Sequence, residues 1–320
     1  MTAPGYNGRA GGVVAARPPV ALPEVLALRP GSIVALRPLT FADTLDSIVL
    51  VLRWSLAPVA VVVFAVVWPD LLIREAIMAR LAPVPTSSLD PDALLQAYVA
   101  GAPIWVANIL VALFVSAVVS GALVALLGAR DRGSDVGAGA ALLFGVRRSG
   151  AVLGASLLGL GSVAVVALVT VVFATLFGVL IPIVGFLVML PVLLAVLLLG
   201  FAISYLVVPV AIEEGRGPWS SFLRTLVLLR RGAWRVLATT ALVLLLLLTI
   251  AGGLLFLGAV LMDLLGTAGW ILEALGGALL AAIATPLLAA TGFVVHRDLR
   301  VRTEGYDLIV RIDELTGAAR

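Results

Sequence analysis

The chain has 320 residues, of which 62% are hydrophobic and only 12% are charged, and its formal net charge is +3 at pH 7. Soluble domains carry about twice that share of charged residues, so the composition excludes an ordinary soluble protein. The chain contains no cysteine and a single histidine, which excludes disulfides, a cysteine nucleophile and structural zinc sites built from cysteine and histidine. All 21 basic residues are arginine, which together with the abundance of Ala, Val and Gly is typical of a GC-rich bacterial genome.

The N-terminal residues 1–36 are rich in glycine, proline and alanine and lack the continuous apolar segment of a signal peptide. This composition predicts a disordered cytoplasmic tail. We expect residues 37–300 to form one membrane domain and residues 301–320 to form a cytoplasmic C-terminal tail.

A stretch of 62 residues, from Ala151 to Ile212, contains no charged residue. As one helix it would be about 93 Å long, three times the hydrocarbon thickness of a bilayer. It must therefore hold at least two spans joined by a turn, which we place between Gly178 and Gly185, around Pro182. The chain is accordingly predicted to be a multi-pass membrane protein.

Hydropathy predicts an all-α fold with six spans. They are expected at 55–68 with an extension to 73, 102–127, 151–177, 186–212, 236–262 and 274–295. The first is short for the roughly 20 residues that a span needs. Either its helix continues through Pro69 and Asp70 into the outer interface, or Arg53 snorkels and the span begins earlier. Residues 70–101 are expected to form two short outer helices, the second beginning at Asp90-Pro91.

The arginines predict the orientation in the membrane. Nineteen of the 21 lie in the N-terminal segment, the loops after the second and fourth spans, and the C-terminal tail. Only Arg74 and Arg80 fall on the other side, together with six carboxylates. The positive-inside rule therefore places both termini in the cytoplasm, and we expect a bacterial cytoplasmic membrane.

The chain also repeats a unit, consisting of an amphipathic interfacial helix, a bend at arginine, a span outward and a span back. The first unit begins at Thr40, which forms a predicted capping box with Asp43. The third begins at Pro218, a residue suited to the first helical position, and the unit between them is fainter. The bends are expected at Arg53, Arg147-Arg148 and Arg230-Arg231. The alternative is coincidence, because the positive-inside bias alone places arginine at such joints.

Three short motifs carry a resemblance to a known family. They are LRPLTFADTLD (Leu36–Asp46), RRGAWRVL (Arg230–Leu237) and HRDLRVRTEGYDL (His296–Leu308), below called the first, second and third motif. The chain resembles, over about residues 36–310, the bacterial membrane-domain family named after glycerophosphoryl diester phosphodiesterases. Some members carry a catalytic barrel, which is absent here. The resemblance implies a stand-alone membrane domain whose family role is largely undefined.

Charged residues at the cytoplasmic joints form one candidate site. Asp43, Asp46 and Asp298 are expected at matching depth. We hypothesise that they pair with arginines and close the cytoplasmic surface into a ring; the candidate members are Asp43, Asp46, Arg53, Arg148, Arg231, Asp298 and Arg300. The alternative is solvated charge, worth about 0–1 kcal/mol per pair.

Polar groups within the spans form a second candidate site, and the deepest are Asn108, Ser116, Ser120, Ser204 and Tyr205. They predict either a polar cleft for a lipid headgroup or a pore, or hydrogen-bonded packing between helices. The spans contain no ionisable residue at depth, which argues against proton-coupled transport. The single histidine, His296, is interpreted as an interfacial residue at a helix end.

Three classes of function remain. The leading prediction is a non-enzymatic scaffold or accessory subunit of a membrane complex, because no acid, base and nucleophile come together and no metal or cofactor site is evident. The alternative is a lipid-handling or transport protein with a cleft between spans. An intramembrane enzyme is the third class. The expected partners are anionic lipid headgroups at the cytoplasmic face and other membrane proteins, and no nucleic acid.

Overall fold

The computed structural model describes residues 34, 37–81, 91–180, 182–265, 269–306 and 308 of the chain. Within these ranges the regular structure is entirely helical, which confirms the all-α prediction. The elements are α1 (Phe41–Val62), η2 (Val63–Val67), α2 (Trp68–Leu81), α3 (Pro91–Asp131), α4 (Ala138–Leu180), α5 (Pro182–Glu213), α6 (Pro218–Leu265) and α7 (Gly269–Glu304). The predicted tails 1–36 and 301–320 lie largely outside the described residues.

Six helical segments are long and apolar enough to cross a membrane, which confirms the predicted multi-pass architecture. They cover Ser55–Arg74, Val99–Asp131, Ala138–Phe173, Leu190–Glu213, Pro218–Gly258 and Leu275–Glu304. The predicted turn in the uncharged stretch is also found, because α4 ends at Leu180 and α5 begins at Pro182.

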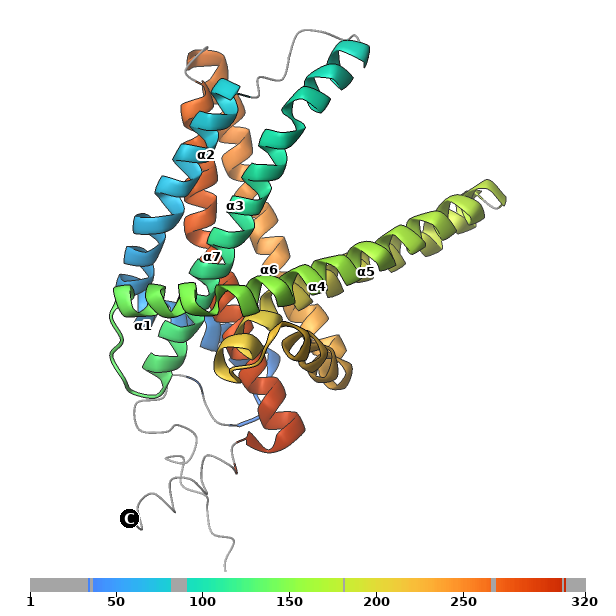
Figure 1. The fold of residues 1–320 in the computed structure, drawn as a ribbon. Coiled ribbons are helices and arrows are strands. Elements are labelled where there is room, and N and C mark those ends of the chain that lie inside the picture. The colour runs from blue at the N-terminus through green and yellow to red at the C-terminus, as the bar shows by residue number, and fades with distance from the viewer. Residues whose placement is uncertain are drawn as a thin grey trace, which may run out of the picture.

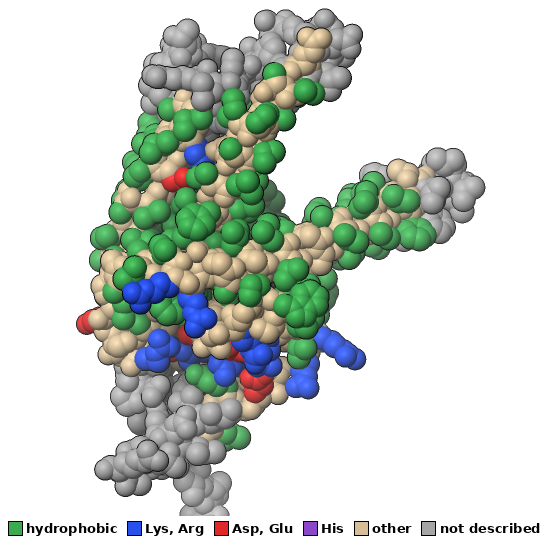
Figure 2. All heavy atoms as spheres, viewed as in Figure 1, with side chains coloured by type: hydrophobic (Ala, Val, Ile, Leu, Met, Phe, Trp, Pro, Cys, Tyr) green, Lys and Arg blue, Asp and Glu red, His purple; other side chains and the backbone are tan. Residues whose placement is uncertain are grey.

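The spans form two groups (Figure 1). The segment α1–η2–α2 forms a bundle with α3, α7 and the later part of α6. The helices α4 and α5 form an antiparallel hairpin that crosses the lower part of this bundle and projects from it to one side. Most of the arginines and carboxylates gather at the lower end (Figure 2), which we call the arginine-rich end. The described part of the chain enters α1 and leaves α7 at this same end.

The first span is one continuous helical path from Phe41 to Leu81, so the helix continues through Pro69 and Asp70 as the first alternative for this span expects. Its helix passes through Pro69 without ending. Proline has no N–H to donate to the carbonyl four residues earlier, here Ala65. The five π-helical residues of η2 precede Pro69 and widen the helix where that bond is missing. The two outer helices are thus α2, which continues the first span, and the beginning of α3 at Pro91.

The residues of the predicted interfacial helices form the beginning of α1, α4 and α6, and α1 and α4 continue from there into their spans without a break. The capping box at α1 is present, with the Thr40 hydroxyl accepting from the Asp43 N–H and the Asp43 carboxylate accepting from the Thr40 N–H. The predicted bend occurs in α6, where Gly232 leaves helical geometry (φ −131°, ψ 20°). The helices α1 and α4 run through Arg53 and Arg148 without such a break.

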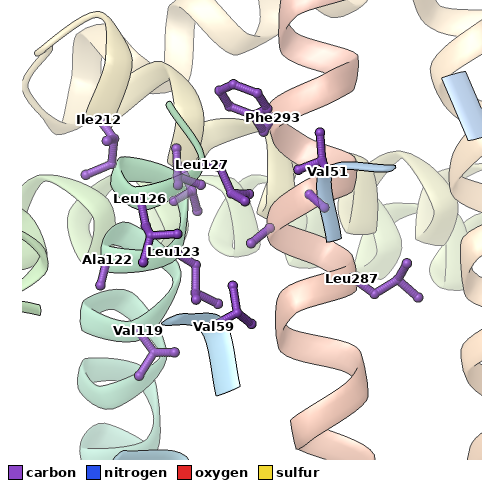
Figure 3. Close-up of a cluster of buried hydrophobic side chains, with 14 of the residues drawn as sticks. Val51, Val59, Val119, Ala122, Leu123, Leu126, Leu127, Ile212, Leu287 and Phe293 are labelled. Atoms are coloured by element: carbon purple, nitrogen blue, oxygen red, sulfur yellow. The ribbon is translucent and has the colours of Figure 1, made fainter. Parts of the chain in front are cut away.

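The hydrophobic core lies toward the arginine-rich end and joins α1, α3, α5 and α7. Phe293 of α7 faces Leu127 of α3 and Val51 of α1 (Figure 3). Two glycines allow the helices to approach closely. A Cβ atom on Gly145 would lie 2.4 Å from the Val118 carbonyl oxygen, and one on Gly292 would lie 2.6 Å from that of Tyr205.

Candidate functional site

The end of α7 carries a buried run of charged residues that matches the third motif. His296 is 0% exposed and Asp298 is 3% exposed, although both lie where the helix reaches the arginine-rich end. Arg297 between them is also buried. Buried charge is unfavourable unless it is paired and hydrogen-bonded, so the partners of these residues define the site.

Asp298 is bound by three segments at once. Its carboxylate lies 3.2 Å from Arg235 Nε and 3.0 Å from Arg302 Nε, and it accepts a 2.8 Å hydrogen bond from the backbone N–H of Leu39. The carbonyl oxygen of Leu39 in turn accepts from both arginines. Leu39 belongs to the first motif, Arg235 to the second and Asp298 to the third. The residues that carry the family resemblance therefore meet at one point.

Arg297 forms a second part of the cluster. Its guanidinium lies 3.1 Å from Asp131 Oδ2 at the end of α3 and 3.2 Å from Glu213 Oε2 at the end of α5. Its Cζ atom stands 5.1 Å from the ring centre of Phe293 and 5.3 Å from that of Tyr306. Two carboxylates and two aromatic faces thus compensate one buried guanidinium, and they tie α3, α5 and α7 together.

Glu214, after the end of α5, completes the cluster. Its carboxylate lies 3.3 Å from His296 Nε2, and accepts from Arg216 Nε at 2.7 Å and Arg224 Nε at 3.1 Å. Burial alone would raise the pKa of Glu214, but the hydrogen bonds from His296 and Arg216 and the charges of His296 and Arg224 lower it from 4.5 to about 2. We call Asp131, Glu213, Glu214, Arg235, His296, Arg297, Asp298, Arg300 and Arg302 the charge cluster.

The structure places two of the seven predicted ring residues, Asp298 and Arg300, in the charge cluster; Arg300 Nε lies 3.3 Å from Glu304. Asp43 caps α1 and pairs with Arg37 at 3.3 Å, and these hydrogen bonds, led by those to Thr40, lower its pKa. The other candidates lie apart. Arg148 and Arg231 donate to the carbonyls of Gly215 and Thr303 at 3.2 Å each, while Asp46 and Arg53 are exposed and have no ion-pair partner within the described ranges.

Sequence reasoning missed the carboxylates that hold the cluster together. The signal was the pair Glu213-Glu214 directly after the uncharged stretch, together with Asp131 at the end of the second span. Each stands at a span end, where a solvated residue is the usual interpretation. Its burial depends on which helix ends meet, and hydropathy does not show this.

Four of the five predicted intramembrane polar residues line one cavity between α3, α4, α5 and α7. Its volume is about 200 Å³, and we call it the midspan cavity. The hydroxyl groups that line it belong to Ser116, Ser120, Ser156, Ser204, Tyr205 and Thr285. Leucines from α3, α4 and α7 form the remaining walls, and the lining includes no charged residue.

Half of these hydroxyls already have hydrogen-bond partners within the protein. Ser120 donates to the carbonyl of Ser116 at 2.6 Å, Ser204 donates to a carbonyl of its own helix, and the Tyr205 hydroxyl lies 2.7 Å from that of Thr240. The hydroxyls of Ser116, Ser156 and Thr285 have no hydrogen-bond partner within the described part of the chain. Helix packing therefore accounts for only part of the polar lining.

The fifth residue, Asn108, lies elsewhere, in a groove between α2 and α3 that also contains Asp70 and Arg74. Among the described residues, no group of three or more His, Cys, Asp or Glu side chains is placed to hold a metal ion.

No protein-family model, no curated protein and no solved structure matches the chain.

Proposed function

We propose that this membrane protein is a lipid-handling or transport protein that binds a neutral, membrane-soluble molecule in the midspan cavity. The observation that carries the proposal is the set of three hydroxyls, on Ser116, Ser156 and Thr285, that face one cavity without an internal partner. An unpaired hydroxyl surrounded by hydrocarbon is unfavourable, and a ligand with hydrogen-bonding groups removes that cost. A ligand without net charge fits, because the lining is uncharged.

The depth of the cavity supports a membrane-soluble ligand. Thr285 precedes His296 by 11 residues, about 17 Å of helix. This distance along α7 is close to half of the roughly 30 Å hydrocarbon thickness, which supports a binding site near the middle of the bilayer, where transport proteins commonly bind their substrates.

The cavity is open to one side. Leu157 and Leu160 of α4 line it and are 47% and 45% exposed. They belong to the hairpin that diverges from the bundle (Figure 2). A lipid can therefore reach the hydroxyls laterally, with its apolar part against the leucines.

A scaffold or accessory subunit is the second candidate. The spans in α4 and α6 bury few of their side chains within the chain, and Leu255 and Phe256 are among the most exposed apolar residues. Such faces suit partner helices as well as lipid. In either case we propose that the arginine-rich end faces the cytoplasm of a bacterium, where it meets anionic headgroups. We also propose that the chain is a non-enzymatic member of the family that its three motifs resemble.

The test is native mass spectrometry of protein purified gently from its own membranes. We expect the wild type to retain one class of neutral lipid, and the variant Ser116→Ala/Ser156→Ala/Thr285→Val to lose it while keeping its melting temperature. Thr249→Val is the matched control, because its hydroxyl bonds Leu245 of its own helix outside the cavity. Equal retention of the neutral lipid by the triple variant and by Thr249→Val would exclude the cavity as the binding site. A stoichiometric protein partner without enriched lipid would favour the scaffold.

A further inference from the structure

A second hollow lies between α2 and α3, away from the arginine-rich end. Its volume is about 390 Å³, and its apolar walls are Ile73, Ile77, Pro103, Ile104, Ala107 and Val111. Three polar residues, Asp70, Arg74 and Asn108, lie among them. We call this hollow the α2–α3 groove. The midspan cavity shares none of these residues.

The polar residues of the groove are only partly satisfied. Arg74 Nη2 lies 2.9 Å from Asp70 Oδ2, and the two side chains are 19% and 13% exposed. Arg74 Nε is buried away from the groove and has no hydrogen-bond partner among the described residues, whereas the Nη groups are the accessible part of the guanidinium. The side-chain amide of Asn108 also has no partner within the described part of the chain. The groove therefore offers a guanidinium donor, an amide and a carboxylate to a ligand.

The groove lies at the level of the lipid headgroups in the leaflet opposite the arginine-rich end. Arg74 follows Arg53 by 21 residues in a continuous helical path, which corresponds to about 32 Å. This is the thickness of the hydrocarbon layer. Since Arg53 lies near the arginine-rich end, Arg74 reaches the far boundary, where the phosphates of that leaflet begin.

We propose that the α2–α3 groove binds one phospholipid whose headgroup carries both a phosphate and a primary ammonium group, as in phosphatidylethanolamine. The phosphate accepts hydrogen bonds from the Nη groups of Arg74 and from the Asn108 amide, and the ammonium donates to the Asp70 carboxylate. The acyl chains pack on the isoleucines and Val111.

The pairing of charges selects this headgroup. Asp70 and Arg74 have opposite charges that cancel within the groove, so a zwitterion matches both. A purely anionic headgroup would leave the Asp70 carboxylate without an ammonium partner and close to a second negative charge. Phosphatidylglycerol, which has a phosphate but no ammonium group, therefore tests the need for the positive charge. Phosphatidylcholine keeps that charge but has no N–H, so it tests the need for hydrogen-bond donors on the nitrogen.

The experiment uses the full chain in micelles that contain equal amounts of the three phospholipids, and native mass spectrometry of the retained lipid. We expect the wild type to retain phosphatidylethanolamine preferentially. Asp70→Asn should keep phospholipid binding but reduce the preference for ethanolamine over glycerol by about tenfold, the effect of losing one charge-assisted hydrogen bond. Arg74→Lys should weaken retention of all three lipids, because lysine keeps the positive charge and lacks the forked Nη donors of the guanidinium.

Two controls keep the result interpretable. Asn108→Ala changes no charge, and it should weaken retention several-fold with an unchanged melting temperature. The cavity variant Ser116→Ala/Ser156→Ala/Thr285→Val should retain phosphatidylethanolamine like the wild type, so a failure of the cavity proposal leaves this one standing. Equal retention of the three lipids by the wild type, or an unchanged preference in Asp70→Asn, would overturn the proposal.

Discussion

Arg235 and Asp298 form a 3.2 Å ion pair that joins α6, just after its break at Gly232, to α7 where that helix reaches the arginine-rich end. The same carboxylate accepts a hydrogen bond from the backbone N–H of Leu39, which directly precedes α1. One buried acid thus fixes the relative positions of the first, fifth and sixth spans. The positions of these spans in turn define the cluster around His296 and the arginine-rich end of the bundle.

Asp298→Ala should therefore destabilise the protein strongly. The substitution leaves Arg235 without its buried partner and removes the acceptor for Leu39, and loss of one member of a buried pair costs about 3–5 kcal/mol. We expect a clear fall in the melting temperature in detergent, followed by tryptophan fluorescence. Asp46→Ala is the matched control, because Asp46 is exposed and unpaired, and it should change the free energy of unfolding by about 0.5 kcal/mol or less. Equal effects of both substitutions would contradict the importance of the cluster.

The charge cluster also predicts a dependence of stability on pH. The pKa of Glu214 is lowered to about 2 in the folded protein from a value near 4.5. A group with a lowered folded pKa stabilises the fold above its unfolded pKa, and this contribution is lost as the pH falls through the interval between the two values. Glu214→Gln removes the ionised form at every pH.

The difference in melting temperature between the wild type and Glu214→Gln should consequently be present at about pH 5 and above. It should narrow as the pH falls below about 4.5. A difference that stays the same down to pH 3 would show that the carboxylate contributes nothing through its charge.

Close helix packing gives a third prediction. In Gly145→Ala the new Cβ would meet the Val118 carbonyl oxygen at 2.4 Å and the Ala122 nitrogen at 3.0 Å, both backbone atoms that cannot rotate away. Separating α3 from α4 should cost about 1–3 kcal/mol. Gly150→Ala on the same helix meets nothing within 4 Å and should be neutral or stabilising, because alanine favours helix over glycine. The melting temperature should therefore fall in Gly145→Ala and stay equal or rise in Gly150→Ala relative to the wild type.

The sequence predicted the spans well because hydropathy and length are local properties. The turn near Pro182, the capping box at Thr40 and the start of α3 at Pro91 all depend on residues close in the chain, and each is present. The sequence could not decide whether Ser116, Ser120, Ser204 and Tyr205 line one cavity or serve helix packing. Periodicity within one helix does not show which other helix packs against it.

The charged residues were harder to predict because burial at the arginine-rich end depends on contacts between distant helices. Glu213 and His296 each stand at the end of a span, where solvent exposure is the usual outcome. Both are buried because the ends of α3, α5 and α7 converge there. The hypothesis of a charge ring named two members of this site, Asp298 and Arg300, and did not include their carboxylate and histidine neighbours.

The orientation in the membrane can be tested directly because the chain has no cysteine. Gly137 is exposed near the arginine-rich end with no atom within 4 Å of its Cβ position, and Gln96 is exposed near the opposite end of α3. With 19 of 21 arginines predicted on the cytoplasmic side, a membrane-impermeant maleimide should label Gln96→Cys in intact bacterial cells. It should label Gly137→Cys only after permeabilisation. The opposite pattern would invert the topology, and it would assign the α2–α3 groove to the cytoplasmic leaflet.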